Sequence, residues 1–300
     1  MKNLPILKAG DQVEIIAPAS RCAPQDLIYL KELLESWQLN CHISHDIFGP
    51  DLLCANSDEY RLEALKNALQ NPDIKAIICA RGGYGCMRLI PGLTQLQPPT
   101  SPKLFIGMSD ITALQLYLGQ HWGWSTIHGS LSRDKFSPES INLLKSILFA
   151  DIEQIEWNGV PLNHLAEKDH LLESSLTGGN LCLVQASIGT SWQIEGTNKM
   201  IFLEEIAERG YRVDRMLEHL KQANRLNDAA AIVFGDFIEG NEPNGSNLLQ
   251  PVLTRFAEQC HLPVVQIKGA GHGYINYPLI LGTKAQLQFG KKIKLTCFRS

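Results

Sequence analysis

Residues 102–119 decide the fold and read Pro-Lys-Leu-Phe-Ile-Gly-Met-Ser-Asp-Ile-Thr-Ala-Leu-Gln-Leu-Tyr-Leu-Gly. Residues 103–107 predict a short buried strand, and residues 110–118 predict an amphipathic helix. Gly107 lets the chain turn sharply between them, because glycine adopts backbone angles that other residues avoid. Ser109 is therefore expected at the tip of the turn. Its hydroxyl would project from the carboxyl end of the strand, beside the N–H groups that open the helix.

This arrangement is that of a nucleophile elbow, although the motif Gly-x-Ser-x-Gly is absent. Asp110 and Ile111 follow the serine, so Ile111 stands where the motif has its second glycine. A simpler interpretation is that Ser109 or Asp110 only caps the helix, since both residue types are preferred N-caps. The segment alone leaves both interpretations open.

Length and composition predict a two-domain globular protein. The 300 residues exceed the usual size of one compact domain, and the fractions of 44% hydrophobic and 19% charged residues are ordinary for globular chains. The net charge is −4 and no long basic run occurs, so no nucleic-acid partner is expected. No segment approaches the length of a membrane span, and no signal peptide can be discerned at the N-terminus. We therefore expect no membrane association.

The cysteine pattern predicts a protein of a reducing compartment, and the histidine spacing predicts no metal site. The eight cysteines are scattered and form no Cys-x-x-Cys pair, which fits a cytoplasmic protein better than a disulfide framework. His42 and His45 lie close together, but no third ligand stands near them, and zinc needs three or four.

Strand and helix patterns alternate through the first half of the chain. Apolar runs at residues 13–17, 74–80 and 103–107 predict buried strands, and helices are expected between them. Such β–α repeats predict an α/β fold with a parallel sheet and helices on both faces. Ligands bind beyond the carboxyl ends of such strands, where both Ser109 and the glycine-rich loop at residues 81–85 should lie.

The alternation weakens at residues 152–163, where residues 157–161 predict a turn. We therefore expect an N-terminal α/β domain at residues 1–155 that carries the nucleophile. A connector at residues 156–175 and a smaller C-terminal α/β domain at residues 176–300 would follow. The C-terminal domain again alternates, with strands expected at 199–203, 229–234, 263–267, 279–283 and 286–289 and helices at 181–187, 211–222 and 248–259.

A serine nucleophile needs a base within hydrogen-bond reach and a third group that orients the base. Of nine histidines, only His272 stands between glycines after an apolar strand, where its ring is unobstructed. Glu204 and Glu205 follow four apolar residues and are candidates for the orienting carboxylate. Neighbouring residues of a strand point to opposite faces, so at most one of the two glutamates can face the site.

Seven blocks in fixed order resemble the LD-carboxypeptidases, serine peptidases of the muramoyltetrapeptide carboxypeptidase type. They span almost the whole chain, from Val13 to Leu287. The blocks are Arg81-Gly82-Gly83-Tyr84-Gly85, Gly107-Met108-Ser109-Asp110-Ile111-Thr112-Ala113-Leu114, His128-Gly129, Gly178-Gly179-Asn180-Leu181, Phe202-Leu203-Glu204-Glu205, Tyr211-Arg212-Val213-Asp214-Arg215-Met216-Leu217 and Gly271-His272-Gly273 with Asn276-Tyr277-Pro278.

The resemblance implies a triad of Ser109, His272 and Glu204 in a cleft between two domains, in a homodimeric enzyme. It implies removal of the terminal D-alanine from a cytoplasmic murein tetrapeptide, without metal or cofactor. For the oxyanion we expect the N–H of Asp110, next after the nucleophile, and one from Gly83. Arg81 would either bind the terminal carboxylate of the substrate with a forked pair of hydrogen bonds or brace its own loop.

Two departures from the family pattern concern the walls of the site. Ser130 follows His128-Gly129 where the family often has proline, and Cys86-Met87 follow the glycine-rich loop. Cys86 is a rival nucleophile, although an activated thiol needs a histidine beside it in space.

Two other functions stay open at this point. One is hydrolysis of a peptide–nucleotide conjugate, which would need an aromatic slot from residues such as Trp122, Trp124 or Trp192. The other is a non-catalytic sensor of murein peptides.

Overall fold

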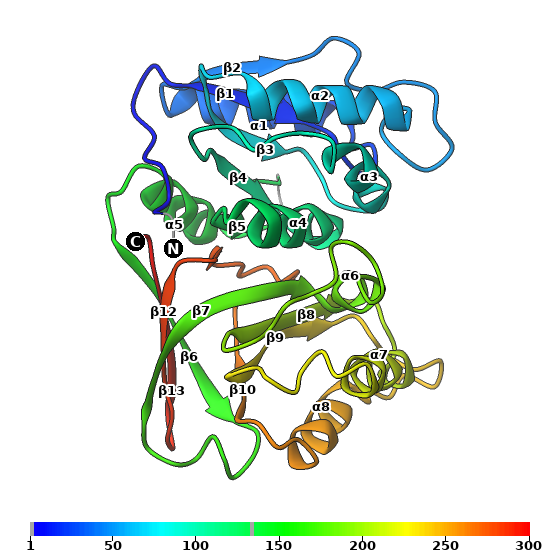
Figure 1. The fold of residues 1–300 in the computed structure, drawn as a ribbon, viewed down its shortest axis with the longest axis vertical. Coiled ribbons are helices and arrows are strands. Elements are labelled where there is room, and N and C mark those ends of the chain that lie inside the picture. The colour runs from blue at the N-terminus through cyan, green and yellow to red at the C-terminus, as the bar shows by residue number, and fades with distance from the viewer. Residues whose placement is uncertain (1–2, 133–134) are drawn as a thin grey trace.

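A computed structural model describes residues 3–132 and 135–300, and they form two packed layers (Figure 1). The N-terminal layer is a six-stranded sheet in the order β11-β5-β4-β3-β1-β2. Five strands run parallel, as the β–α repeats predict: β1 (Gln12–Ile16), β2 (Asn40–Ile43), β3 (Ile74–Cys79), β4 (Leu104–Gly107) and β5 (Thr126–His128). Strand β11 (Leu279–Leu281) joins from the far end of the chain and pairs antiparallel with β5.

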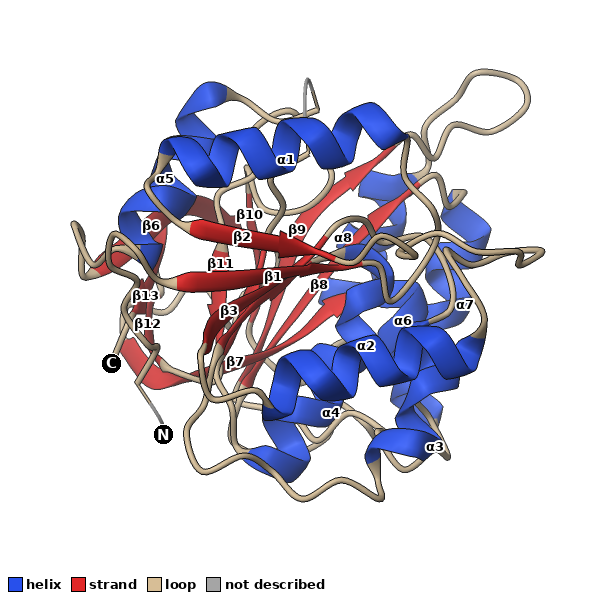
Figure 2. Ribbon diagram, turned by 90° about the horizontal axis from the view of Figure 1, so that it is seen from above, coloured by secondary structure: helices blue, strands red, loops and turns tan. Residues whose placement is uncertain are grey.

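Helices cover both faces of this sheet (Figure 2). One face carries α1 (Pro24–Ser36) and α5 (Pro138–Leu148), and the other carries α2 (Asp58–Gln70), α3 (Ile90–Leu93) and α4 (Thr112–Trp122). Proline occupies the first turn of α1 and α5, where its missing N–H costs no hydrogen bond. Ser57 and Ser137 cap α2 and α5 by accepting a backbone N–H.

The C-terminal layer is a closed seven-stranded barrel in the order β10-β6-β13-β12-β7-β8-β9. Its strands are β6 (Gln154–Pro161), β7 (Leu171–Asn180), β8 (Met200–Ile206), β9 (Ala231–Ile238), β10 (Val264–Ile267), β12 (Lys284–Gln288) and β13 (Ile293–Phe298). Strands β7 to β10 run parallel, and α6 (Leu181–Ala186), α7 (Gly210–Gln222) and α8 (Leu249–Glu258) connect them. The α/β class with a parallel layer is confirmed.

The turn expected at residues 157–161 is wrong, because these residues form the second half of β6. Ile155 and Trp157 are buried and alternate with exposed neighbours, which is the pattern of a strand. Gly159 is required there by close packing rather than by a turn, since a Cβ would lie 2.3 Å from the carbonyl oxygen of Gln266 in β10. Strands β6 and the start of β7 therefore occupy much of the expected connector. The domain limits themselves stay a prediction.

Helix α4 docks the two layers together. Eight of its eleven residues are buried, more than a helix that exposes a whole face to solvent would bury. At its first residue, Thr112 Oγ1 accepts the Asn180 N–H at 3.0 Å, at the carboxyl end of β7. A Cβ on Gly179 would lie 2.5 Å from the same oxygen, so only glycine permits this approach. The carboxyl ends of strands from both layers consequently meet beside Ser109.

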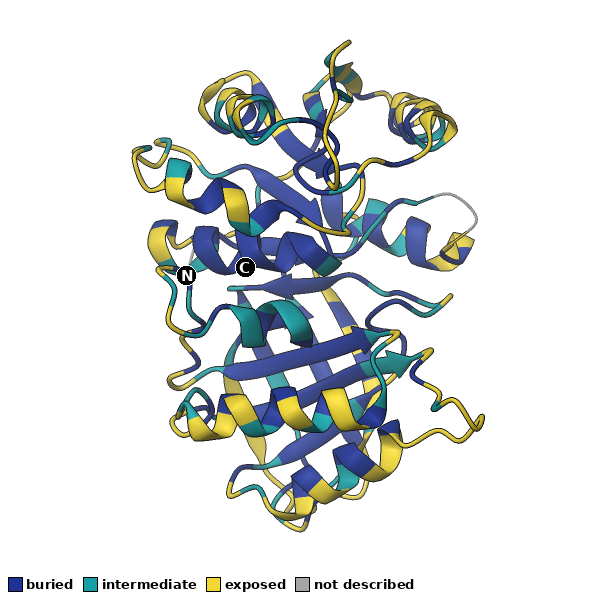
Figure 3. Cartoon of the chain, turned by 90° about the vertical axis from the view of Figure 1, so that its right-hand side faces the viewer, coloured by how far each residue is buried: buried dark blue, intermediate teal, exposed yellow. Residues whose placement is uncertain are grey.

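Strands β4, β5 and β8 are almost entirely buried, whereas the outer helices expose one face each (Figure 3). Among the described residues, no helix combines the length and apolar composition needed to cross a bilayer.

Arg61 is a buried cation in α2 that ties three loops together. Its guanidinium donates to the carbonyl oxygens of Pro18, of Gly85 at 3.1 Å and of Asn56 at 3.0 Å, and it pairs with Asp58. The Pro18 and Gly85 carbonyls belong to loops at the carboxyl ends of β1 and β3. Arg61 therefore holds the glycine-rich loop in place through the Gly85 carbonyl.

Replacing this residue tests that role. Arg61→Met should lower the free energy of unfolding by about 3 kcal/mol, because three buried carbonyls lose their donor. The matched control is Arg88→Met, whose half-exposed side chain bonds the same Asp58 and should change stability little. Urea unfolding of both variants measures the difference, and equal effects would contradict the role assigned to Arg61.

Candidate active site

Ser109 stands on a strained turn between β4 and α4. Its φ of +63° lies in the left-handed region, which non-glycine residues enter rarely and mostly at functional sites. A Cβ on Gly107 would lie 2.6 Å from the Ile111 side chain, so the turn closes only with glycine there. A Cβ on Gly82 would lie 2.7 Å from Ser109 Cβ. The expected elbow is present, and the glycine-rich loop packs directly against the serine.

His272 and Glu204 form a buried hydrogen-bonded pair. His272 lies in the loop after β10, and its Nδ1 is 2.6 Å from Oε2 of Glu204 in β8. Glu204 has no exposed surface, and His272 is 7% exposed. Because a carboxylate only accepts hydrogen bonds, Nδ1 carries the proton and Nε2 is the basic nitrogen. A Cβ on Gly271 would lie 3.1 Å from Glu204 Oε2, so this glycine leaves room for the carboxylate.

Ser109 and His272 line the same cavity, which has a volume of about 190 Å³. Its floor consists of the carboxyl ends of β3 and β4, and Ile206 at the end of β8 contributes from the barrel. A turn in one layer and a loop in the other thus meet between the two layers, as a shared nucleophile and base require.

The other expected site residues have distinct surroundings. Gly83 and Arg81 line the cavity, and Arg81 Nη1 donates to the carbonyl oxygen of Arg21 at 2.9 Å. Arg81 therefore braces a neighbouring loop, not its own. The Asp110 side chain is buried, where Oδ2 accepts the Cys86 N–H at 2.8 Å and burial raises the pKa of the carboxyl. The side chain of Asp110 is thus used by Cys86, and the group that Asp110 offers beside Ser109 is its backbone N–H in the first helical turn.

The rival nucleophile and the aromatic slot find no support. Cys86 has no exposed surface, and burial raises its pKa well above the usual range, so the reactive thiolate is disfavoured. The three candidate tryptophans are buried and none lines this cavity, although Trp124 lines a second cavity between the layers. The aromatic side chain that lines the cavity is Phe136.

Two titratable residues beside the pair were given no role in the sequence analysis. His128 at the end of β5 places Nε2 3.7 Å from Glu204 Oε1. Asp236 in β9 accepts the Gly269 N–H and lies against the glycines that flank His272. His128 belongs to one of the seven blocks that carry the family resemblance, whereas Asp236 is marked only by its position after an apolar run.

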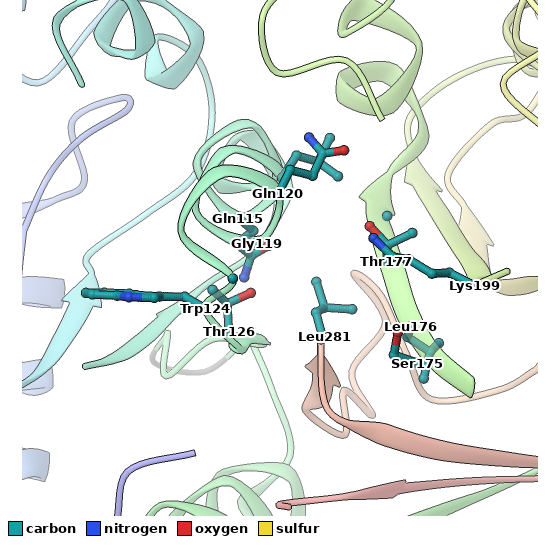
Figure 4. A pocket seen from close by; sticks show the side chains of 14 residues that line it. Gln115, Gly119, Gln120, Trp124, Thr126, Ser175, Leu176, Thr177, Lys199 and Leu281 are labelled. Carbon is teal, nitrogen blue, oxygen red and sulfur yellow. The ribbon is translucent and has the colours of Figure 1, made fainter. Parts of the chain in front are cut away.

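A second cavity of about 190 Å³ lies between the layers, along the C-terminal half of α4. Gln120 and Thr126 line it from the N-terminal layer, Thr177 and Lys199 line it from the barrel, and Leu281 lies between them (Figure 4). None of the residues predicted for catalysis lines this cavity.

A serine on a strained strand–helix turn, facing a cavity shared with a histidine that bonds a buried carboxylate, defines the class of serine hydrolases. Sequence profiles of the LD-carboxypeptidase N-terminal domain and C-terminal domain match residues 13–129 and 173–287. The chain belongs to the LD-carboxypeptidase family.

Similar proteins agree in sequence and in fold. A protein of Rickettsia conorii named as a carboxypeptidase is 41% identical over 94% of this chain and 90% of its own length. The murein tetrapeptide carboxypeptidase of Pseudomonas aeruginosa is 31% identical over 92% and 93%. The crystal structure of muramoyltetrapeptide carboxypeptidase from Oxalobacter formigenes aligns with a TM-score of 0.82 at 29% identity, over 95% and 98%. MccF in complex with glutamyl sulfamoyl guanosine, at 18% identity and a TM-score of 0.81 over 98% of each chain, shares the fold.

Asp236 gives the site a testable pH dependence. Burial, and secondarily the charge of Glu204, raise the pKa of this half-buried carboxyl to about 6. The folded state therefore binds more protons than the unfolded state between about pH 4 and pH 6, and this contribution to stability is lost as the pH rises through 6.

Asp236→Asn removes this titration and keeps an oxygen for the Gly269 N–H. Relative to the unsubstituted protein, the variant should gain about 1 kcal/mol of stability between pH 4 and pH 7. Chemical unfolding across this range measures the gain, with the exposed Asp228→Asn as the matched control. A pH dependence equal to that of the unsubstituted protein would contradict the raised pKa.

Proposed function

We propose that this protein is a serine LD-carboxypeptidase that hydrolyses the L,D-peptide bond before the terminal D-alanine of a murein tetrapeptide, in peptidoglycan recycling. The observation that carries the proposal is the His272–Glu204 hydrogen bond beside the cavity that Ser109 lines. The names of the murein tetrapeptide and muramoyltetrapeptide carboxypeptidases that resemble this chain support the choice of substrate.

The reaction follows from the roles of three side chains. Ser109 Oγ attacks the carbonyl carbon of the L,D bond while Nε2 of His272 takes the hydroxyl proton. The tetrahedral intermediate collapses, the C–N bond breaks, and His272 returns the proton to the leaving D-alanine amine. Water then attacks the acyl-serine ester with His272 as base again, which frees the tripeptide and Ser109. Glu204 stabilises the imidazolium in both halves of the reaction.

The oxyanion of each intermediate needs donors that are already oriented. We assign the N–H of Asp110, which follows the nucleophile in the first turn, and that of Gly83 in the glycine-rich loop. Gly83 has φ +111°, and a Cβ there would lie 2.5 Å from Ser20 Oγ. A side chain at this position would displace the loop that supplies the donor.

The terminal carboxylate of the substrate needs a cation at the cavity wall. Arg81 lines the cavity and uses one N–H for the Arg21 carbonyl. A guanidinium has five N–H donors, so Arg81 retains enough for a forked pair of hydrogen bonds to a carboxylate. We assign this role to Arg81.

The setting of the enzyme belongs to the same proposal. We assign it to the cytoplasm as a homodimer that needs no metal or cofactor and binds neither nucleic acid nor membrane. The free cysteines among the described residues support the cytoplasmic setting, and the net charge of −4 supports the absence of a nucleic-acid partner.

The purified protein should release D-alanine from L,D-tetrapeptides. Ser109→Ala and His272→Ala should each lower kcat by roughly three to six powers of ten, and the double variant should be little worse, because triad members act as a unit. Coupled assay of free D-alanine measures this, with the exposed Ser36→Ala as control. Additive losses would show that the two residues do not share a step. Peptide binding without D-alanine release from the unsubstituted protein would favour the sensor.

The two glutamates of β8 should differ in their effect on turnover. Glu204→Gln removes the charge that stabilises the imidazolium and should lower kcat by roughly a thousandfold or more. Glu205 points to the other face, where it accepts the Asn180 side-chain amide and the Cys182 N–H, both at 2.8 Å. Glu205→Gln should therefore keep kcat within about tenfold of the unsubstituted value. The opposite ranking would show that Glu205, and not Glu204, is the carboxylate that orients His272.

A further inference from the structure

Three polar atoms at the centre of the molecule are buried without a hydrogen-bond partner among the described residues. They are Oε1 of Glu204 and both ring nitrogens of His128. Buried polar groups are normally paired, and an unpaired buried carboxylate oxygen loses its hydration without compensation. Two of these atoms, Glu204 Oε1 and His128 Nε2, lie close enough to serve one another.

The geometry brings one of these nitrogens to the carboxylate. His128 Nε2 lies 3.7 Å from Glu204 Oε1, while the other oxygen, Oε2, lies 2.6 Å from His272 Nδ1. Two imidazoles thus flank a single carboxylate, each on its own oxygen. A displacement of less than an ångström would bring His128 Nε2 within the usual hydrogen-bond distance.

The ring of His128 is held from both layers. It belongs to β5 of the N-terminal sheet, where it pairs with Leu279 of β11. Phe202 of β8 packs against its edge at 5.6 Å between ring centroids and 69° between planes. His128 is 1% exposed, so its ring has little freedom to leave the carboxylate.

The surroundings of His128 favour its neutral form. Burial lowers the pKa of His128 to about 4, the charge of Glu204 opposes the shift, and His272 adds to it. The other carboxyl groups near Glu204 are those of Asp236 and Glu205, and burial raises the pKa of both. A neutral imidazole carries one N–H, and a carboxylate next to Nε2 favours the proton on that nitrogen.

We propose that His128 is a positioning residue: its Nε2–H donates to Glu204 Oε1 and holds the carboxylate so that Oε2 faces His272. The proposal rests on the proposed hydrolase function. It extends the chain of interactions to four side chains, in the order Ser109, His272, Glu204 and His128. The first and last of these belong to the N-terminal layer, so the carboxylate is held correctly only while the layers stay docked.

Two substitutions separate this role from simple packing. His128→Leu fills the space without a donor, and His128→Gln can present its Nε2 amide close to the ring nitrogen that it replaces. The leucine variant should lose roughly tenfold to hundredfold in kcat with KM little changed, because a hydrogen bond to a charged group is lost. The acid limb of its kcat profile should move to higher pH, since removing a donor favours the protonated carboxyl.

The glutamine variant should recover most of the lost kcat and the original pH profile. The matched control is Thr126→Val, a buried polar-to-apolar change on the same strand and the same face of β5. Equal losses in the leucine and glutamine variants, or a leucine variant with unchanged kcat and pH profile, would overturn the proposal.

A spectroscopic measurement decides the question without any assay of activity. In protein labelled with ¹⁵N-histidine, the His128 signals are those missing from His128→Gln. The proposal predicts a neutral Nε2–H tautomer at pH 7, and a neutral Nδ1–H tautomer or a cation would overturn it. If the unsubstituted protein releases no D-alanine, the hydrolase function fails, and the tautomer still tests the contact with Glu204.

Discussion

The antiparallel pairing of β11 with β5 is the constraint on which the site depends. Strand β5 neighbours β4, which ends at the turn that carries Ser109, and β11 follows the loop that carries His272. The Gly129 N–H also donates to the Gly107 carbonyl at 3.1 Å, next to the elbow. A three-residue strand from the C-terminal part therefore ties the loop of His272 to the sheet that carries Ser109.

Burial strengthens the electrostatic interactions of the site that the pairing of β11 with β5 positions. Glu204 is fully excluded from water, and in such surroundings its negative charge stabilises a neighbouring imidazolium far more than it would in solvent. The same burial raises the pKa of Glu205 to about 7 and of Asp236 to about 6, each with the charge of Glu204 as a further cause. Three carboxyl groups lie near the ends of β8 and β9, and Gly271 in the His272 loop lets the backbone pass between Glu204 and Asp236. Ionisation of Glu205 and Asp236 therefore costs folding free energy at this end of the barrel.

Much of this arrangement could be predicted from sequence because the signals were local. Apolar runs and helix starts predicted the parallel sheet, and Gly107 before Ser109 predicted the sharp turn. Strand alternation predicted that Glu204 and Glu205 face opposite sides, although it left open which of them faces His272. The family resemblance chose Glu204, the glutamate whose carboxylate bonds His272 in the structure.

The remaining features depend on contacts between distant segments. Residues 157–161 carry turn-forming residue types, yet they form β6 because Gly159 packs against β10. Nothing in residues 279–281 indicates that they complete the first sheet and not the barrel. His128 is a single polar residue on a short apolar strand, and its meaning appears only when Glu204 is placed beside it. Periodicity cannot reveal pairs that belong to different layers.

The central claim is that Ser109 is the nucleophile, and the most direct test is to trap the covalent intermediate. Rapid acid quenching of the protein with an L,D-tetrapeptide, followed by proteolysis and mass spectrometry, locates the acyl group. The account predicts an adduct with the mass of the peptide minus D-alanine on the fragment that holds Ser109, and none in Ser109→Ala. Turnover with the adduct on Cys86 or another residue, or undiminished D-alanine release by Ser109→Ala, would contradict it.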